Sequence, residues 1–478
     1  MPYTVYSGCV VSPSGLSRLS ILPNGLLCVD NETGKIVGVH NDSKSAPESL
    51  SALLKQWVGK PVDESEIKSV RLKDTQFLMP GFIDTHTHAP QFSFIGLGHD
   101  LPLMDWLEKY TFPHESDFKD LDNARNLYES AASFTIRNGT TCAAYYATIH
   151  LESCLTLVDI LRKRGQRAFV GKVNMVQNAP DFYIETLDET MDATVKFIEE
   201  VARTRPEGVT QDSPLDIVKP IITPRFAPSC TMECLKKLAK VAKEHNLPIQ
   251  THLNENRSEI EFVASQFPGS DSYAGVYGEA GLLTDRTVLA HCVHNTEPEL
   301  KMMKEKNVGI SHCPNSNLSL TSGMCDVRRF LLSGFKVGLG TDVSGGYSPT
   351  IMDAMRMAAT TNRALTAEKI ASKTGLNEED TTPLGVPELI YLATLGGAQV
   401  LGLESQVGSL EQGKQFDALL IDLETENSPV PAENVTPSVK NEKNALTKWQ
   451  RRIEQFLYLG DDRNITNVFV NGRLIHSL

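Results

Sequence analysis

Two histidines one residue apart follow an apolar run early in the chain. The segment Met79–His88 has the sequence Met-Pro-Gly-Phe-Ile-Asp-Thr-His-Thr-His. Residues i and i+2 of a β-strand project from one face, so His86 and His88 at a strand end would direct two imidazoles toward one point. Two neutral imidazoles supply half of a typical zinc site, and Asp84 offers a carboxylate able to orient a ligand. The alternative is two histidines that share a turn, and only further ligands elsewhere decide between them.

The elements that would position such ligands follow one repeated pattern from about residue 75 to about residue 365. Short apolar or β-branched runs alternate with segments of helical periodicity, such as Met232–Glu244 and Glu297–Lys306. This repeat predicts an α/β fold of the (β/α)8 TIM-like barrel type, with a doubly wound open sheet as the alternative. In a barrel, reacting groups lie at the C-terminal ends of strands. The predicted strands cover residues 77–83, 140–146, 168–175, 216–223, 248–252, 287–291, 308–312 and 336–341.

The two ends of the chain have a different pattern. Residues 1–75 contain short alternating runs separated by turns, and Val468–Ile475 carries Asn-Gly between two apolar runs, which is a hairpin signal. We therefore predict a small β-sandwich-type domain built from residues 1–75 and 401–478. The barrel domain is predicted over residues 76–400.

Two stretches in the end segments lack periodicity. Residues 424–443 are rich in Pro, Glu, Asn and Ser, which predicts a surface insertion. Residues 41–66 are similar, apart from a helix predicted near Leu50–Trp57. Neither stretch has a pattern typical of catalysis.

Composition restricts the partners of the protein. The chain has 478 residues, of which 41% are hydrophobic and 22% charged, as in ordinary globular proteins. Its formal net charge of -13 argues against nucleic acids and anionic membranes, which need a basic patch. The nine cysteines form no Cys-x-x-Cys pair, and neither a signal peptide nor a membrane span is evident. We expect a cytoplasmic protein that acts on a small molecule.

The predicted strand ends supply the further ligands. His252 ends the fifth predicted strand, His291 ends the sixth, and Asp342 follows the eighth. Each residue alone has an ordinary structural explanation, as a hydrogen-bonded buried histidine or a helix-capping aspartate. A barrel, however, would bring all of them to one mouth together with the histidine pair. The sequence therefore predicts a metal site there.

This arrangement resembles the amidohydrolase superfamily. The resemblance implies that His86, His88, His252 and Asp342 hold one divalent cation per subunit, with His291 as an unligated or weakly associated partner. Three histidines and a carboxylate suit Zn²⁺, and Fe²⁺ accepts the same donors. The choice between the two metals stays open at this point.

Binuclear members of that superfamily usually add a carboxylated lysine from a central strand. The candidates in this chain, Lys172 and Lys219, lie before or inside their predicted strands. The fourth predicted strand is followed by Pro224, Arg225 and Phe226 instead. We therefore expect a mononuclear site.

Longer segments are similar to the guanine deaminases, one family within that superfamily. They span most of the predicted barrel, and the Glu-Asn-Arg and Thr-Asp-Val-Ser-Gly-Gly-Tyr segments distinguish this family from its relatives. Pro90 departs from the family pattern, which has a small polar residue there, but it removes no functional group. The similar segments are Asp84–Phe92, Trp106–Pro113, Thr223–Phe226, Glu255–Arg257, His312–Asn317 and Gly340–Tyr347.

The resemblance implies a pocket for a purine. A guanidinium at Arg225 suits the guanine O6 atom, and an aromatic face at Phe226 suits the flat ring. Taken without the resemblance, Arg225 is equally well explained by a structural ion pair and Phe226 by a place in the core. The residues implied to contact substrate are His88, Gln91, Arg225, Phe226, His252, Glu255 and Asp342.

The implied reaction is hydrolytic deamination of guanine to xanthine and ammonia, with attack of an activated water on C2. Asp342, in reach of metal and water, would accept the proton of the water. Glu255, three residues after His252, would protonate N3 and pass a proton to the leaving amine, while His291 would hydrogen-bond the attacking oxygen. By itself, Glu255 is also explained as a solvated residue at the start of a helix.

Two other functions remain open. A related hydrolase that acts on a different heterocycle would use the same metal and acid. A non-catalytic barrel scaffold is the second, although such a protein would be expected to have lost ligands. The family further suggests a homodimer.

Overall fold

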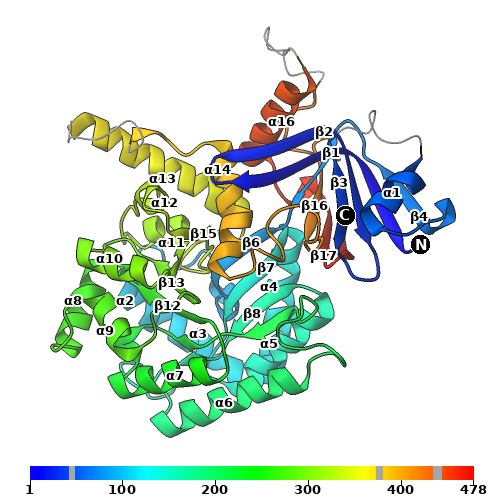
Figure 1. Ribbon diagram of the computed structural model, residues 1–478. Coiled ribbons are helices and arrows are strands. Elements are labelled where there is room, and N and C mark those ends of the chain that lie inside the picture. Colours follow the sequence, from blue (N-terminus) through cyan, green and yellow to red (C-terminus); the bar gives the residue numbers. More distant parts are fainter. Residues whose placement is uncertain (42–48, 373–380, 434–443) are drawn as a thin grey trace.

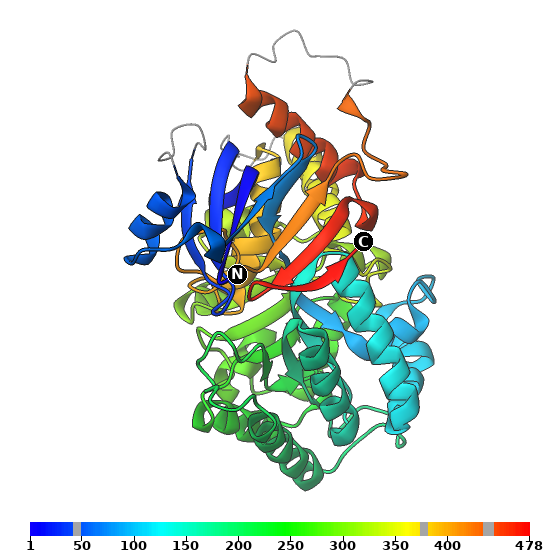
Figure 2. The ribbon, with the colours of Figure 1, turned by 90° about the vertical axis from the view of Figure 1, so that its right-hand side faces the viewer.

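A mixed sheet is built from both ends of the chain (Figures 1 and 2). The computed structural model describes residues 1–41, 49–372, 381–433 and 444–478. The strand order is β18-β17-β16-β5-β1-β2-β3, with β4 paired to β1, and both chain termini lie at this sheet. The predicted Asn-Gly hairpin is confirmed as β17 and β18. The strands are β1 (Tyr3–Gly15), β2 (Arg18–Asp30), β3 (Ile36–His40), β4 (Ile67–Arg71), β5 (Gln76–Pro80), β16 (Ala418–Asp422), β17 (Ile465–Val470) and β18 (Arg473–Ser477).

The middle of the chain forms a parallel sheet whose strand order is β10-β8-β7-β6-β15-β14-β13-β12. Most of these strands are buried along their whole length, which explains their continuous apolar runs. An isolated parallel bridge also pairs Ile222, after β10, with Ile249 in β12. The predicted α/β fold with a parallel sheet is confirmed. The strands are β6 (Phe82–His88), β7 (Thr140–Tyr146), β8 (Arg167–Gly171), β10 (Val218–Pro220), β12 (Ile249–Leu253), β13 (Thr287–His291), β14 (Gly309–His312) and β15 (Lys336–Leu339).

Helices connect the parallel strands and surround the sheet (Figure 1). The predicted helix 232–244 is confirmed with the same bounds, and its N-cap Thr231 accepts a hydrogen bond from the Cys234 backbone. Among the described residues, no helix combines the length and apolar character that crossing a membrane requires. The helices are α1 (Leu50–Val58), α2 (Leu103–Trp106), α3 (Phe112–Ser116), α4 (Leu121–Arg137), α5 (Leu151–Arg164), α6 (Leu187–Arg203), α7 (Met232–Glu244), α8 (Arg257–Gln266), α9 (Tyr273–Ala280), α10 (Glu297–Glu305), α11 (Pro314–Ser319), α12 (Val327–Leu332), α13 (Ile351–Ser372), α14 (Val386–Tyr391), α15 (Gly397–Val400) and α16 (Ala445–Leu459).

The predicted strand 77–83 is wrong in its bounds, because the run divides at Gly81 between two sheets. Strand β5 belongs to the mixed sheet, and β6 begins the parallel sheet one residue later. A Cβ at Gly81 would lie 2.1 Å from the Thr141 hydroxyl oxygen, so the crossing admits only glycine. Both strands are buried, and an apolar run therefore shows no boundary. As a result, His86 and His88 lie within β6, at its C-terminal end, and not beyond a strand that ends at residue 83.

Two other predicted strands are each two short strands. The run 168–175 divides into β8 and β9 (Val173–Asn174), and the run 216–223 into β10 and β11 (Thr223–Pro224). Strands β9 and β11 pair only with each other, in a separate two-stranded sheet. Of the predicted surface stretches, residues 42–48 and 434–443 lie outside the described part of the chain.

Candidate active site

The C-terminal end of β6 carries both histidines of the pair. His86 Nε2 lies 2.9 Å from Asp342 Oδ1, and His88 Nε2 lies 3.3 Å from the same oxygen. Burial lowers the pKa of His86 to about 4 and also lowers the pKa of His88. Both rings are therefore neutral at neutral pH, which is the form that binds metals.

Asp342 enters the site from a left-handed backbone conformation after β15, with a φ of 47°. Its backbone N–H donates to the His86 carbonyl at 2.9 Å, so the end of β15 is tied to β6. Asp84 reinforces this tie, because its carboxylate accepts from the Thr341 hydroxyl at 2.6 Å and from the Thr341 backbone at 3.1 Å. Asp84 thus holds the loop that presents Asp342, whereas the sequence indicated a partner for a histidine ring. Burial favours protonation of Asp342, but His86 and His291 outweigh it and hold its pKa well below the usual range.

Two further histidines are fixed in a defined tautomer. His252 Nδ1 donates to the Arg225 carbonyl at 2.6 Å, and His291 Nδ1 donates to the Asn317 side-chain oxygen at 2.8 Å. Bonds of this kind leave the Nε2 atom of each ring directed at the site. His291 Nε2 is buried without a hydrogen-bond partner, 3.7 Å from Asp342 Oδ2.

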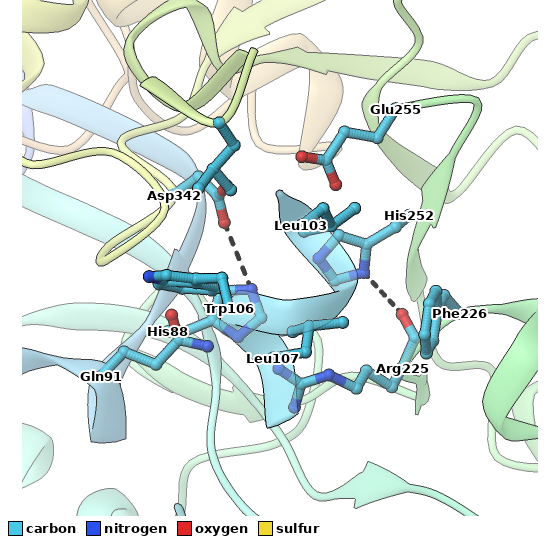
Figure 3. Close-up of a pocket in the computed structure, with 11 residues that line it drawn as sticks. His88, Gln91, Leu103, Trp106, Leu107, Arg225, Phe226, His252, Glu255 and Asp342 are labelled. Atoms are coloured by element: carbon cyan, nitrogen blue, oxygen red, sulfur yellow. Dashed lines mark hydrogen bonds and ion pairs between the residues drawn. The ribbon is translucent and has the colours of Figure 1, made fainter. Parts of the chain in front are cut away.

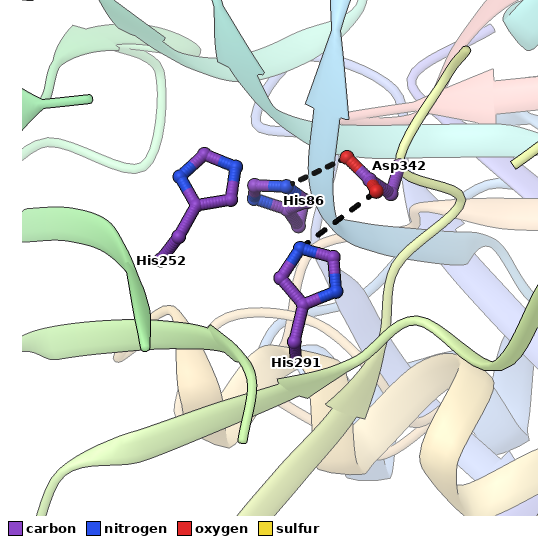
Figure 4. A group of neighbouring side chains, drawn as sticks. All are labelled: His86, His252, His291 and Asp342. Carbon is purple, nitrogen blue, oxygen red and sulfur yellow. Dashed lines mark hydrogen bonds and ion pairs between the residues drawn. The ribbon is translucent and has the colours of Figure 1, made fainter. Parts of the chain in front are cut away.

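These side chains form a cluster whose atoms suit a cation. His86, His252, His291 and Asp342 each offer a ligand atom, and all four atoms lie within 4.8 Å of one another (Figure 4). His88 borders the cluster through Asp342, and its Nδ1 atom is buried without a partner. A donor set of neutral imidazoles and one carboxylate fits Zn²⁺. The structure therefore groups His291, predicted to be unligated or weakly associated, with three of the four predicted ligands.

A pocket opens beside this cluster (Figure 3). Its wall includes every side chain that the sequence indicated as a substrate contact. It also includes apolar residues to which the sequence assigned no role: Leu103, Trp106, Leu107 and Leu320. Three of these lie where α2 passes into a π-helical turn over Leu107–Thr111. Their i, i+3, i+4 spacing places them on one face of the helix, and only the folded chain shows that this face lines the pocket.

Glu255 lies between the pocket and the metal-competent cluster. It is 4% exposed, and its Oε2 atom is 3.5 Å from His291 Nε2. Its other oxygen accepts a hydrogen bond from the Ser322 hydroxyl at 3.2 Å. Burial raises the pKa of Glu255 to about 7, so this carboxyl holds and releases a proton near neutral pH. Glu255 is therefore a buried residue that precedes helix α8, and not a solvated residue at the start of that helix.

Sequence and structure comparisons agree with this geometry. Residues 77–475 match the amidohydrolase family. The chain belongs to that family. This amidohydrolase is 41% identical over 473 residues to guanine deaminase of Dictyostelium discoideum, with 98% of both chains covered. It is 42% identical over 478 residues to guanine deaminase of Rattus norvegicus, covering 98% of this chain and 96% of the other. Among solved structures, guanine deaminase from C. acetobutylicum with guanine bound in its active site aligns with a TM-score of 0.82 and 34% identity, covering 99% of this chain and 100% of the other.

One buried carboxylate at the pocket of this amidohydrolase was missed by the sequence analysis. Glu115 in α3 is 0% exposed and forms an ion pair with Arg225, with Nη1 to Oε2 at 2.7 Å and Nη2 to Oε1 at 3.1 Å. Arg225 therefore has the structural partner that its ordinary explanation required, and it also lines the pocket. The only sequence signal was a single acidic residue after an aromatic stretch, which is too common to predict a contact 110 residues away.

Proposed function

We propose that this amidohydrolase converts guanine to xanthine and ammonia by hydrolytic deamination. The observation that carries the proposal is the position of Glu255, a buried carboxyl able to transfer protons. On one side of it lies the cluster of histidines with Asp342, and on the other lies the pocket lined by Arg225 and Phe226. The relatives from Dictyostelium discoideum and Rattus norvegicus, at 41% and 42% identity and matched over 98% and 96% of their length, are guanine deaminases. A relative at 34% identity holds guanine in its active site.

The cation is proposed to be one Zn²⁺ per subunit, held by His86, His88, His252 and Asp342. When bound, it supplies Lewis acidity and lowers the pKa of water toward about 7. The binding of one cation and not two is supported by Lys172, whose ammonium contacts Glu185 Oε2 at 2.5 Å and is thereby held in an ion pair.

The protein groups then divide the proton transfers. Asp342 is ionised at neutral pH and accepts the proton of the attacking water. Glu255 donates its proton to guanine N3, which makes C2 more electrophilic. It then passes the second proton of the water, from the new C2 hydroxyl, to the amine as the C2–N bond breaks and ammonia leaves. The proton held by Asp342 returns to Glu255. Burial lowers the pKa of His291, but Glu255 and Asp342 outweigh it and raise the pKa. His291 Nε2, which is buried without a hydrogen-bond partner, is proposed to hydrogen-bond the attacking oxygen.

Substrate is held by groups on the other side of the pocket. Arg225 is proposed to donate to guanine O6. Phe226 is proposed to cover the purine ring, because it lines the pocket with its ring centroid 6.3 Å from that of His252. Gln91 completes this side, and its orientation is fixed because the Ser344 backbone N–H donates to its Oε1 at 2.8 Å.

Replacing Arg225 with lysine tests this assignment. The Arg225→Lys variant keeps the positive charge but loses the planar fork that contacts both Glu115 and substrate. We expect the KM for guanine to rise about tenfold or more, with a smaller change in kcat, in steady-state assays. An unchanged KM would remove Arg225 from the substrate contacts.

We also propose that the parallel sheet closes into the (β/α)8 barrel of residues 76–400. Support comes from the Gln250 backbone N–H, which donates to the Ile222 carbonyl at 2.9 Å and so links the two ends of the strand order. The small β-sandwich-type domain comprises residues 1–75 and 401–478, with β5 as the strand that leads from one domain to the other. We further propose a homodimer, which sedimentation analysis tests. We propose a cytoplasmic location, which microscopy of the tagged chain tests.

The decisive experiment is incubation of zinc-loaded protein with guanine, followed by ultraviolet absorbance and by chromatography of xanthine. We expect turnover of guanine and a stoichiometric release of ammonia. Turnover of another heterocycle in place of guanine would favour the related hydrolase. A protein without bound metal and without turnover would favour the non-catalytic scaffold.

A further inference from the structure

Glu115 is saturated with hydrogen bonds from the substrate side of the pocket. Its Oε1 accepts from Gln91 Nε2 at 2.9 Å and from Arg225 Nη2 at 3.1 Å. Its Oε2 accepts from Arg225 Nη1 at 2.7 Å and from the Tyr183 hydroxyl at 2.7 Å. The side chain thus holds three residues that come from different parts of the chain, and two of them line the pocket.

These bonds determine which hydrogens remain for a ligand. Each terminal nitrogen of Arg225 carries two hydrogens and donates one of them to Glu115. The other hydrogen on each nitrogen can therefore bond to a ligand. Gln91 directs its nitrogen at Glu115 and its oxygen at the Ser344 backbone, so its amide has one orientation. A ligand in this part of the pocket therefore meets N–H donors whose positions are set before it arrives.

The same pair determines the local charge. Among the described residues that line the pocket, Arg225 is the one lysine or arginine. Its side chain is 4% exposed and that of Glu115 is 0% exposed, so solvent screens neither. Burial favours the neutral carboxyl of Glu115, but Arg225 outweighs it and lowers the pKa, so both groups stay ionised. The pair contributes donors to the pocket without a net positive charge.

We propose that Glu115 is a positioning residue that makes the pocket selective for neutral oxopurines over anionic ones. An unpaired Arg225 would attract an anionic purine, whereas the neutral pair gives no compensation for the dehydration of an anion. Guanine and hypoxanthine are neutral at neutral pH, and urate is an anion. This inference rests on the proposed guanine site and goes further by naming the residue that sets its charge selectivity.

The test compares proteins whose pair differs in net charge. Wild type and the double variant Glu115→Gln with Arg225→Met have a neutral pair, and Glu115→Gln has a positive one. Arg225→Met is neutral as well, because burial favours the protonated carboxyl of Glu115 once Arg225 is gone. Calorimetry on the zinc-loaded proteins gives the Kd of urate and the Kd of hypoxanthine. We expect the ratio of urate Kd to hypoxanthine Kd to fall on the order of tenfold in Glu115→Gln and to stay near the wild-type ratio in Arg225→Met. The double variant should return to the wild-type ratio.

Tyr183→Phe is the matched control, because it removes one hydrogen bond to Glu115 without a change in charge. It should weaken the binding of both ligands alike and leave the ratio unchanged. A loss of local order by itself does not distinguish a neutral ligand from an anionic one. The proposal is overturned if the ratio is constant across the charge series, or if Tyr183→Phe shifts it as far as Glu115→Gln does. Should Glu115→Gln fail to fold, Glu115→Ala supplies the positive pair in its place and must show the same fall in the ratio. Guanine turnover by wild type, measured in parallel, tests the proposed function separately.

Discussion

The Glu255→Gln variant is expected to fold normally, to keep its zinc and to lose guanine turnover by a factor of about 10² to 10⁴. Glutamine has the same shape as glutamate and still accepts from the Ser322 hydroxyl, so the local packing is kept. It has no proton to deliver to N3 and none to return to the leaving amine. The loss should appear in kcat, because the step that fails follows binding.

The buried position of Glu255 is what makes this effect large. A solvated glutamate would exchange its proton with water, and other donors would replace it. Glu255 is 4% exposed, and burial raises its pKa to about 7, so the protonated form exists at neutral pH without a strong acid present. The control is Glu261→Gln, an exposed residue on helix α8, which follows Glu255; this variant should behave as wild type. A kcat for Glu255→Gln close to that of wild type would exclude this residue as the proton carrier.

Removal of the His252 side chain is expected to abolish stable zinc binding and, with it, measurable turnover. Its imidazole presents Nε2 to the site because Nδ1 is engaged with the Arg225 carbonyl at 2.6 Å. Loss of a ligand should weaken zinc binding by more than the roughly 10- to 100-fold that the loss of an outer hydrogen-bond partner causes. Zinc content after dialysis against a chelator, measured by mass spectrometry, should fall to background in His252→Ala.

The control for this experiment is His245→Ala, at the C-terminal end of α7, which should retain a full complement of zinc. Circular dichroism should show that both variants are folded. Zinc content equal to that of wild type in His252→Ala, with turnover intact, would contradict the proposed ligand set.

The same measurement distinguishes His88, at the border of the cluster, from His291, within it. If His88 is a ligand and His291 is not, His88→Ala should lose zinc, while His291→Ala should keep most of it and still turn over guanine slowly. The reverse result would favour the group of His86, His252, His291 and Asp342, whose ligand atoms lie within 4.8 Å of one another. Either result identifies the residue left to contact the attacking oxygen.

Much of the parallel sheet was predictable because its strands are buried on both faces and appear as uninterrupted apolar runs. The runs at 140–146 and 287–291 match β7 and β13 with the same bounds. The errors came where an apolar run changes its pairing partner, as at Gly81. Pairing partners are distant in sequence, so local pattern does not contain the boundary.

The sequence by itself determined which residues stand at the ends of the strands, because strand length and alternation with helices are local properties. Histidine and carboxylate side chains at those ends were enough to predict a metal site, since a parallel sheet directs the C-terminal ends of its strands toward one edge. The resemblance of segments around them indicated the reaction.

Only the tertiary structure decided how the pocket is lined and charged. Glu115 meets Arg225 across 110 residues of chain, and α2 with the turn after it brings Leu103, Trp106 and Leu107 to the same pocket wall. The fold also brings His291 together with His86, His252 and Asp342. Such contacts depend on the packing of α2, α3 and the strand ends against one another, and the free energy of that packing comes from burial of side chains that are distant in sequence. The histidine pair therefore predicts a metal site from the sequence alone. The pocket beside that site is defined only in the folded chain.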